Sequence, residues 1–321
     1  MGKSEALRFL VIGSNGQVGW ELCRTLSSLG EVVAIDRPDV ELSSADSIRA
    51  VIRDKQPKVI INAAAYTAVD KAEEEPELAM QINAFAPAVM ADEARRLSAL
   101  FVTYSTDYVF DGSKTGSYAE DDQPNPLSVY GKTKLAGDDA VKDSGASYLI
   151  FRTSWVYGAR GKNFLLTMKR LATERKEIKV VDDQVGAPTW SRSIAEATAQ
   201  IIAQRMSPEL HGSRSAAETF AEITGLYNLT CTGETSWCGF AAKIADQVRA
   251  SREGSVARIL PIKTDEYPVR ARRPMNSILN NTKLKRTFGL QLPVWDAALN
   301  LVMDELRGSQ QALPAGIEVT R

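Results

Sequence analysis

A tyrosine and a lysine four residues apart, Tyr130 and Lys134, are the pair of side chains best suited to chemistry in this sequence. On a helix this spacing puts both on one face, so the ammonium lies within reach of the phenol. A phenol titrates near ~10, and a neighbouring cation lowers that pKa by stabilising the phenolate. The pair therefore predicts a general acid or base. The same spacing also occurs on the solvated faces of many helices, so the surrounding elements decide between the two interpretations.

A glycine-rich loop stands near the start of the chain. The apolar run 7–12 ends in a Gly-x-x-Gly-x-x-Gly spacing, and a helical pattern follows directly. A strand, a tight loop and a helix N-terminus in this order bind a pyrophosphate through backbone N–H groups. We therefore expect a dinucleotide site formed by Gly13, Asn15, Gly16, Gln17, Val18 and Gly19.

The next predicted strand, 32–35, ends in Asp36 and Arg37, which favour different cofactors. An acidic side chain at this place binds the ribose hydroxyls of NADH, whereas an arginine can accept the 2′-phosphate of NADPH. Glu41 and Leu42 belong to the same expected site. The sequence leaves NADH and NADPH open, and a polar strand end without a ligand is the alternative.

Two further strands are expected to bring residues to the cofactor. The strand 59–62 runs into small residues that let a ligand lie against the backbone, and a long helix is predicted over 76–97. The strand 100–104 ends at Ser105 and Thr106, at the edge of a parallel sheet where ligands bind. Thr106 could contact both a substrate and Tyr130, or it could be a helix cap or turn residue. The cofactor contacts expected from these segments are Ala63, Ala64, Ala65, Tyr66, Asn83 and Ser105.

Length and pattern predict an α/β protein with two domains. We expect a Rossmann-type doubly wound parallel sheet over 1–153 and about 191–225, and a smaller α/β substrate domain over 154–190 and 226–310. Residues 311–321 are predicted to be a flexible tail. Residues 207–225 look like a surface insertion, and they contain His211, the only histidine, so a histidine-based triad or metal cluster is not expected.

Charge and cysteine content limit the partners and the compartment. With 39 basic and 40 acidic side chains the net charge is −1, which gives no electrostatic reason to expect a nucleic acid or an anionic membrane. The sequence has neither a signal-peptide pattern nor an apolar run of transmembrane length. The three cysteines fit no metal or redox motif and are expected to be buried thiols, so we predict a cytoplasmic protein.

Several runs together resemble the dTDP-4-dehydrorhamnose reductase family, a branch of the extended short-chain dehydrogenase/reductase superfamily. They span nearly the whole chain: GQVG at 16–19, NAAAYTAVD at 62–70, STDYVFDG at 105–112, VYGKTK at 129–134, RTSWVY at 152–157, QVGAPT at 184–189 and ARRP at 271–274.

The resemblance implies reduction of the keto group of dTDP-4-dehydro-β-L-rhamnose by NADPH or NADH. Tyr130 then corresponds to the proton donor, and Lys134 to the group that lowers its pKa and holds the nicotinamide ribose. Thr106 takes the place of the usual serine and would hydrogen-bond the carbonyl oxygen. The substrate contacts implied are Thr67, Val69, Thr106, Asp107, Tyr108, Trp155, Gln184 and Arg273.

Two of these substrate contacts have ordinary alternatives. Trp155 could supply an apolar wall for a deoxysugar, or it could be a core aromatic residue. Arg273 or a neighbour could pair with the diphosphate, or it could be a surface arginine.

Some members of the resembled family hold a divalent cation between subunits through glutamates. Glu21 and Glu305 fit two of those places, but Arg192 stands where a further carboxylate would be, and a guanidinium opposes cation binding. We therefore expect no metal, in a monomer or homodimer. Two other functions stay open: another nucleotide-sugar reductase or epimerase, and a non-catalytic regulatory subunit resembling that of methionine adenosyltransferase, which works by binding a partner enzyme.

Overall fold

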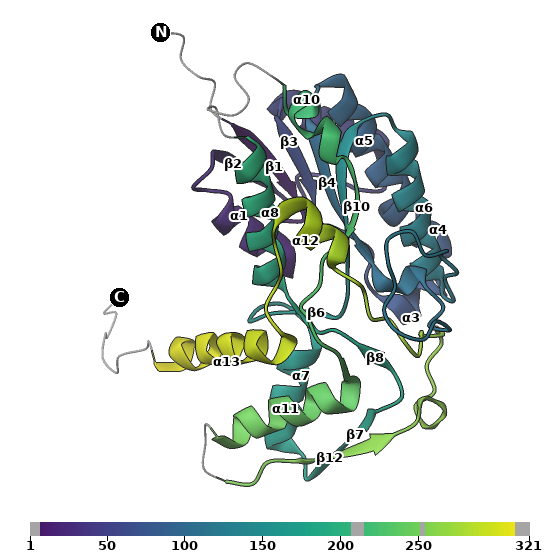
Figure 1. Cartoon of the computed structure of the whole chain (residues 1–321), viewed down its shortest axis with the longest axis vertical. Helices are drawn as coiled ribbons and strands as arrows, with labels where there is room; N and C mark the ends of the chain where they lie inside the picture. The colour runs from purple at the N-terminus through teal and green to yellow at the C-terminus, as the bar shows by residue number, and fades with distance from the viewer. Residues whose placement is uncertain (1–6, 207–214, 251–253, 312–321) are drawn as a thin grey trace.

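The computed structural model describes residues 7–206, 215–250 and 254–311, and they form a parallel six-stranded sheet with helices on both faces (Figure 1). The strand order is β10-β5-β4-β3-β1-β2. The chain therefore adds β2 on one side of β1 and β3, β4 and β5 on the other, which places a switch of direction between β1 and β3. The predicted doubly wound fold is confirmed. The strands are β1 (Arg8–Ile12), β2 (Glu31–Ile35), β3 (Val59–Asn62), β4 (Leu100–Thr106), β5 (Ser147–Thr153) and β10 (Gly225–Asn228).

The central strands are apolar on both faces because both faces are covered. In β1, Phe9 and Val11 belong to one core cluster and Leu10 and Ile12 to the other, as expected when successive side chains alternate across a sheet. The first cluster includes residues of α1 (Gln17–Thr25) and α8 (Ser191–Arg205). The second includes residues of α2 (Ala45–Lys55), α5 (Ala86–Arg96) and α6 (Val129–Asp143).

The single long helix predicted over 76–97 is wrong in one respect, because a π-helical turn interrupts it. The segment consists of α4 (Pro76–Met80), the π turn η1 (Gln81–Phe85) and α5. Pro87 has no N–H, so it cannot donate the usual helical hydrogen bond to the carbonyl of Asn83. That carbonyl instead faces α6, where a Cβ added to Gly137 would lie 2.1 Å from the Asn83 oxygen.

Part of the predicted surface insertion belongs to the core instead. Residues 207–214, including His211, lie outside the described residues, but α10 (Ala216–Phe220) and η3 (Ala221–Ile223) bury Phe220 and Ile223 in the first cluster. The strand expected over 226–229 is present as β10, yet it pairs with β5 in the main sheet. The sheet therefore extends past the boundary at which the substrate domain was expected to begin, and α12 (Thr282–Phe288) packs beside β10.

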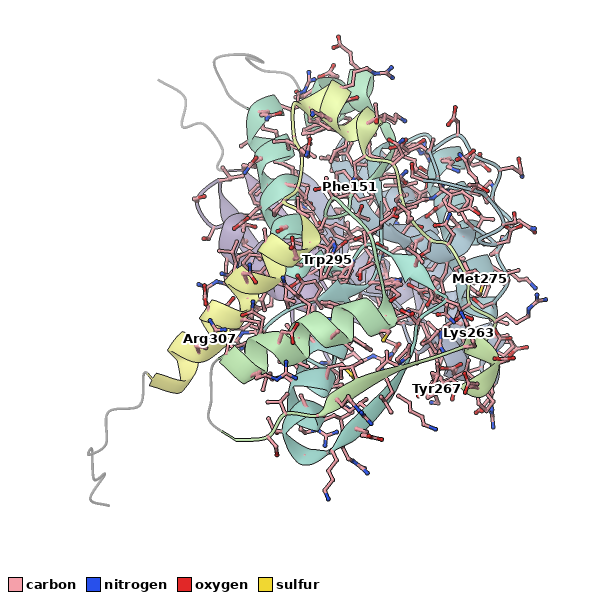
Figure 2. The ribbon with its side chains drawn as sticks, turned by 60° about the horizontal axis from the view of Figure 1, so that its bottom comes forward. Phe151, Lys263, Tyr267, Met275, Trp295 and Arg307 are labelled. Atoms are coloured by element: carbon pink, nitrogen blue, oxygen red, sulfur yellow. The ribbon has the colours of Figure 1, made fainter. Side chains whose placement is uncertain are left out.

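The remaining elements form a smaller lobe, shown below the sheet in Figure 1. Its helices α7 (Phe164–Glu174) and α11 (Trp237–Ala250) pack together beside the parallel pair β7 (Glu177–Val181) and β12 (Arg258–Ile262). Figure 2 shows Lys263, Tyr267 and Met275 on the segment that follows β12, with Trp295 and Arg307 near the two ends of α13 (Trp295–Gln311). The short elements are α3 (Val69–Ala72), η2 (Asp107–Val109), β6 (Val156–Tyr157), β8 (Val185–Gly186), β9 (Thr189–Trp190), β11 (Thr235–Ser236) and η4 (Thr264–Glu266).

Across the described ranges, none of the helices combines the length and the apolar character that crossing a membrane requires. The expected tail 311–321 lies almost wholly outside the described residues.

Candidate active site

The glycine loop follows β1 and is so tightly packed that side chains do not fit. Gly13 has a φ of 85°, and a Cβ added there would lie 2.7 Å from the backbone nitrogen of Ala64. A Cβ on Gly19 would lie 2.0 Å from the carbonyl oxygen of Gly13. The end of β1, the start of α1 and the segment after β3 therefore approach one another through bare backbone, as a dinucleotide loop requires.

The N-terminus of α1 is open toward this loop. Gly16 is the N-cap residue, and no side chain caps the helix. The backbone N–H groups of its first turn, at Gln17, Val18 and Gly19, are the donors that bind an anion at a helix N-terminus. The Gln17 side chain accepts a hydrogen bond from Asn163 Nδ2 at 2.9 Å, which connects the smaller lobe to the loop.

Asp36 and Arg37, at the end of β2, have different surroundings. The Asp36 carboxylate accepts hydrogen bonds from the backbone N–H of Asn15 at 2.9 Å and from that of Arg37 at 2.8 Å. The Arg37 guanidinium is exposed and has only a 3.6 Å ion pair with Glu41. Glu41 itself accepts hydrogen bonds from Ser43, which lower the pKa of its carboxyl, while Leu42 packs half-buried on the core.

Asn83 joins the cofactor side of the site to α6. Its amide bonds the backbone of Tyr66 twice, accepting from N–H at 2.8 Å and donating to the carbonyl at 3.1 Å. It also donates to Thr133 Oγ1 at 3.1 Å, and the Thr133 hydroxyl donates to the carbonyl of Tyr130 at 2.9 Å. The half-buried residues Ala63, Ala64 and Ala65 form the backbone that leads to Tyr66.

Tyr130 and Thr106 meet at the carboxyl end of β4. Ser128 caps α6 by accepting from the N–H of Gly131 at 3.2 Å, so Tyr130 lies in the first turn. Gly131 allows close packing, because a Cβ there would lie 2.2 Å from the carbonyl oxygen of Tyr108. The Thr106 hydroxyl is close enough to the Tyr130 phenol to lower its pKa, and it donates to Asp107 Oδ1 at 3.0 Å.

Burial raises the pKa of Tyr130 to about 12, and the nearby carboxyls of Asp107 and Asp138 act in the same direction. Lys134 is not among the groups that shift the pKa of Tyr130 in the protein without cofactor, so its expected effect on the phenol stays a prediction. The buried Lys134 ammonium donates to the carbonyl oxygen of Tyr104 at 2.7 Å, and burial lowers the pKa of Lys134. The two side chains do share one face of α6, as their spacing predicted.

The neighbours of Thr106 form a polar wall. Burial raises the pKa of Asp107 to about 7, although hydrogen bonds from Ser277 and Thr106 oppose this. Tyr108 meets the Tyr130 ring edge-on with centroids 5.9 Å apart, and burial raises the pKa of its phenol. Arg273 hydrogen-bonds Tyr108 and donates to Asp70 at 2.7 Å.

A cavity of 330 Å³ lies beside this wall, between the sheet and the smaller lobe. Four of the predicted substrate residues line it: Val69, Tyr108, Gln184 and Arg273. The other lining residues were not predicted, namely Phe164, Met168, Lys179, Val180, Val181, Trp237, Tyr267 and Val269. Except for Lys179, their only sequence signal was apolar or aromatic character in a weakly patterned segment.

The other four predicted substrate residues, Thr67, Thr106, Asp107 and Trp155, are not among the residues that line the cavity. Trp155 stacks on Trp237 with ring centroids 3.6 Å apart and an angle of 8° between the planes, so it supports the cavity wall from behind. Its φ of 46° lies in the left-handed region, which is strained for a tryptophan. Thr67 is exposed on the loop after β3. Ser105, predicted to bind cofactor, donates its hydroxyl to Asp138 in the protein interior.

With this geometry, comparison with known proteins identifies the family. A family model described as the RmlD substrate binding domain matches residues 7–308. The dTDP-4-dehydrorhamnose reductase of Burkholderia thailandensis is 48% identical over 303 residues, covering 94% of this chain and 99% of that protein. The chain belongs to the dTDP-4-dehydrorhamnose reductase family.

Other members of the reductase family agree in sequence and in structure. The protein of the same name from Salmonella typhimurium is 41% identical, covering 94% of this chain and 98% of its own length. Solved reductase structures from Clostridium acetobutylicum (36% identity) and Bacillus anthracis (33% identity) both superpose with a TM-score of 0.84 and cover 94% of this chain and 100% of theirs. The Bacillus anthracis structure is a complex with NADP.

The carboxylates expected at a cation site in this family contact an arginine here. Arg192 donates to Glu21 at 3.1 Å and 3.4 Å and to Glu305 at 2.9 Å. Glu21 is buried, and the guanidinium lies between the two carboxylates. In the part of the chain that the structure describes, no group of three or more His, Cys, Asp or Glu side chains could hold a metal ion.

We expect chelation by EDTA to leave turnover and the melting temperature unchanged. The reason is that Arg192 already supplies the positive charge between Glu21 and Glu305. The measurement is steady-state activity and thermal unfolding before and after dialysis against the chelator. A loss of activity that Mg²⁺ restores would contradict this expectation.

Proposed function

We propose that this chain catalyses the NAD(P)H-dependent reduction of the C4 keto group of dTDP-4-dehydro-β-L-rhamnose to give dTDP-L-rhamnose. The observation that carries the proposal is the pair of Tyr130 and Thr106 hydroxyls, which lie close enough for Thr106 to lower the pKa of the phenol, beside the buried Lys134. This pair stands at the carboxyl end of β4, and Tyr108, whose ring meets that of Tyr130, lines a cavity of 330 Å³. The membership in the reductase family supports the same reaction.

Both hydroxyls act on the substrate carbonyl oxygen, where negative charge develops during reduction. The cofactor, when bound, supplies the hydride that adds to C4. Tyr130 donates the proton to the oxygen, which completes the alcohol, and Thr106 holds that oxygen with a second hydrogen bond. Burial raises the pKa of Tyr130 to about 12, so the phenol stays protonated and able to donate through the whole neutral range.

The chain fits a dinucleotide at the glycine loop. The uncapped first turn of α1 is suited to the pyrophosphate, and the packed glycines let it approach the backbone. Asp36 is suited to the adenosine ribose, and the exposed Arg37 to a 2′-phosphate. We infer that NADPH is accepted as well as NADH, in agreement with the NADP complex of the Bacillus anthracis relative.

Arg37→Ala is expected to raise KM for NADPH by about tenfold and to leave KM for NADH nearly unchanged. One charge-assisted hydrogen bond to the 2′-phosphate is lost, and NADH has no such phosphate. Steady-state kinetics with both cofactors measure the effect. Lys58→Ala, also at the surface but on the loop before β3, is the control. An equal rise for both cofactors would show that Arg37 does not contact the 2′-phosphate.

The sugar nucleotide is proposed to occupy the cavity, with its keto group at Thr106 and Tyr130. Arg273 is suited to the diphosphate because its guanidinium reaches the cavity while Asp70 holds it at 2.7 Å. Asp107, Tyr108 and Gln184 are suited to the sugar hydroxyls, and Val69 to its apolar methyl side. Trp155 and Thr67 are assigned to the same substrate site as its outer support.

The deciding experiment measures loss of NADPH and NADH absorbance with enzymatically generated dTDP-4-dehydro-β-L-rhamnose, beside the UDP and GDP keto-sugars. Oxidation only with the dTDP sugar supports the proposal. Oxidation with another keto-sugar would favour a different nucleotide-sugar reductase. Cofactor binding, seen as fluorescence quenching, without oxidation of any sugar would favour the regulatory-subunit alternative. We also propose that the enzyme is cytoplasmic and acts as a monomer or homodimer.

A further inference from the structure

Two buried charged residues lie directly behind the catalytic pair and have no part in the reaction described above. Asp138, on α6, is 3% exposed, and Arg152, on β5, is 1% exposed. Burying a charge is costly unless it is paired, so such residues require a reason. Neither was singled out by the sequence, because each lies within an otherwise ordinary helix or strand.

Asp138 continues the stripe that Tyr130 and Lys134 begin, since the three stand at successive intervals of four on α6. Its Oδ2 accepts a hydrogen bond from Ser105 Oγ at 2.8 Å and one from Arg152 Nε at 3.3 Å. Ser105 comes from β4 and Arg152 from β5, so two neighbouring strands fix the carboxylate. The Arg152 guanidinium also lies over the ring of Phe110, with its carbon 5.3 Å from the ring centroid, and this contact helps to fix the arginine.

We propose that Asp138 is a positioning residue that keeps the Lys134 side chain in its ammonium form, bound to the carbonyl oxygen of Tyr104. Lys134 is 4% exposed, and burial alone would favour the neutral amine. The Asp138 carboxylate is the compensating negative charge. Arg152 and Ser105 in turn stabilise the ionised form of Asp138 against the effect of its burial, so two neighbouring strands support the lysine through one carboxylate.

The signs of the pKa effects agree with this role. Burial lowers the pKa of Lys134, and Asp138 raises it. Burial raises the pKa of Asp138, while Arg152, Lys134, Ser105 and the more distant Lys142 lower it. Without Asp138 the ammonium would lose its proton at lower pH. The carboxyl groups of Asp107 and Asp138 both raise the pKa of the Tyr130 phenol.

The test is the titration of Lys134 in Asp138→Asn, followed by NMR of isotopically labelled lysine in the full chain without cofactor. The Lys134 signal is assigned by its loss in Lys134→Met. We expect its midpoint to fall by about 1–3 pH units, the usual effect of a close opposite charge. The matched control is Asp139→Asn, the same change at the next position, where the side chain is exposed and pairs with Lys142. An unchanged Lys134 midpoint in Asp138→Asn would overturn the proposal.

Asp138→Asn also leaves the buried Arg152 guanidinium without its carboxylate, which could unfold the protein. Asp138→Asn/Arg152→Met removes both charges and keeps a similar volume. The double variant also removes the Asp138 carboxylate, so its Lys134 midpoint should fall as well. A double variant that folds and titrates like the parent would overturn the proposal as well.

The catalytic part of this inference rests on the proposed function, but the titration does not. Tyr130 keeps its proton up to a pKa of about 12, so an alkaline loss of activity well below that pH reports Lys134. In the double variant this loss should move to lower pH by the same interval as the NMR midpoint, with kcat changed more than the substrate KM.

A shifted midpoint with no reductase activity in the parent would retain the role of Asp138 and reject the proposed function. If the Lys134 midpoint shifts but the pH dependence of activity does not, Asp138 controls the charge of Lys134 without affecting catalysis, and its proposed role in catalysis is rejected.

Discussion

Tyr130→Phe is expected to lower kcat by about 10²-fold or more, because the change removes the group proposed to protonate the carbonyl oxygen. The ring stays, so its edge contact with Tyr108 and the packing of Gly131 against the backbone of Tyr108 in η2 should persist. Cofactor affinity should stay within about twofold, since Lys134 and the glycine loop are untouched. Steady-state kinetics and NADPH fluorescence titration measure the two quantities.

The control for this variant is Tyr148→Phe, a half-buried tyrosine on β5 outside the catalytic group. It should retain full turnover, which would show that loss of a phenol as such is harmless. Turnover equal to the parent in Tyr130→Phe would reject Tyr130 as proton donor. In that case Asp107, whose pKa is raised to about 7 by burial, would be the next acid to examine.

Lys134→Met is expected to lower kcat by about 10²-fold and to weaken cofactor binding by about tenfold. Methionine keeps most of the apolar stem but removes the ammonium that binds the carbonyl of Tyr104 at 2.7 Å and is proposed to hold the nicotinamide ribose. The fold should survive, because Asp138 keeps its ion pair with Arg152. Isothermal titration with NADPH and a pre-steady-state rate measure the two losses.

Lys132→Met is the matched control, because Lys132 lies on the same helix two positions away and is exposed. It should leave both quantities unchanged. Parallel losses in both variants would point to a general effect on the helix. Unchanged cofactor affinity in Lys134→Met would place its role in the proton step alone.

The parts of the fold that follow from local pattern were predictable. The strand, glycine loop and helix at the start of the chain, and the helix that bears Tyr130, appear where the spacing placed them. The π turn at Gln81–Phe85 was not predictable from periodicity, because apolar spacing barely changes when one residue is added to a helical turn. The placement of β10 was also missed, because pairing with β5 is a long-range choice that a short apolar run does not encode.

The site shows the same division. Motif residues could be named from type and spacing, but their protonation could not, because burial is a property of the assembled fold. The raised pKa of Tyr130 and the buried pair of Asp138 and Arg152 arise only when α6 packs on β4 and β5. Trp237 and Phe164 line the cavity because the smaller lobe packs against the sheet. No short sequence motif predicts this packing.

The hydrogen bonds of Asn83 couple the position of the cofactor loop to the position of the proposed proton donor. One amide bonds the backbone of Tyr66 on the cofactor side and, through Thr133, the first turn of α6. One side chain thus connects the loop after β3, which is proposed to bind the cofactor, to the helix that carries the proposed proton donor. Redesign of residues 63–67 for another cofactor is therefore expected to displace Tyr130 in the first turn of α6 as well, unless the hydrogen bonds of Asn83 are retained.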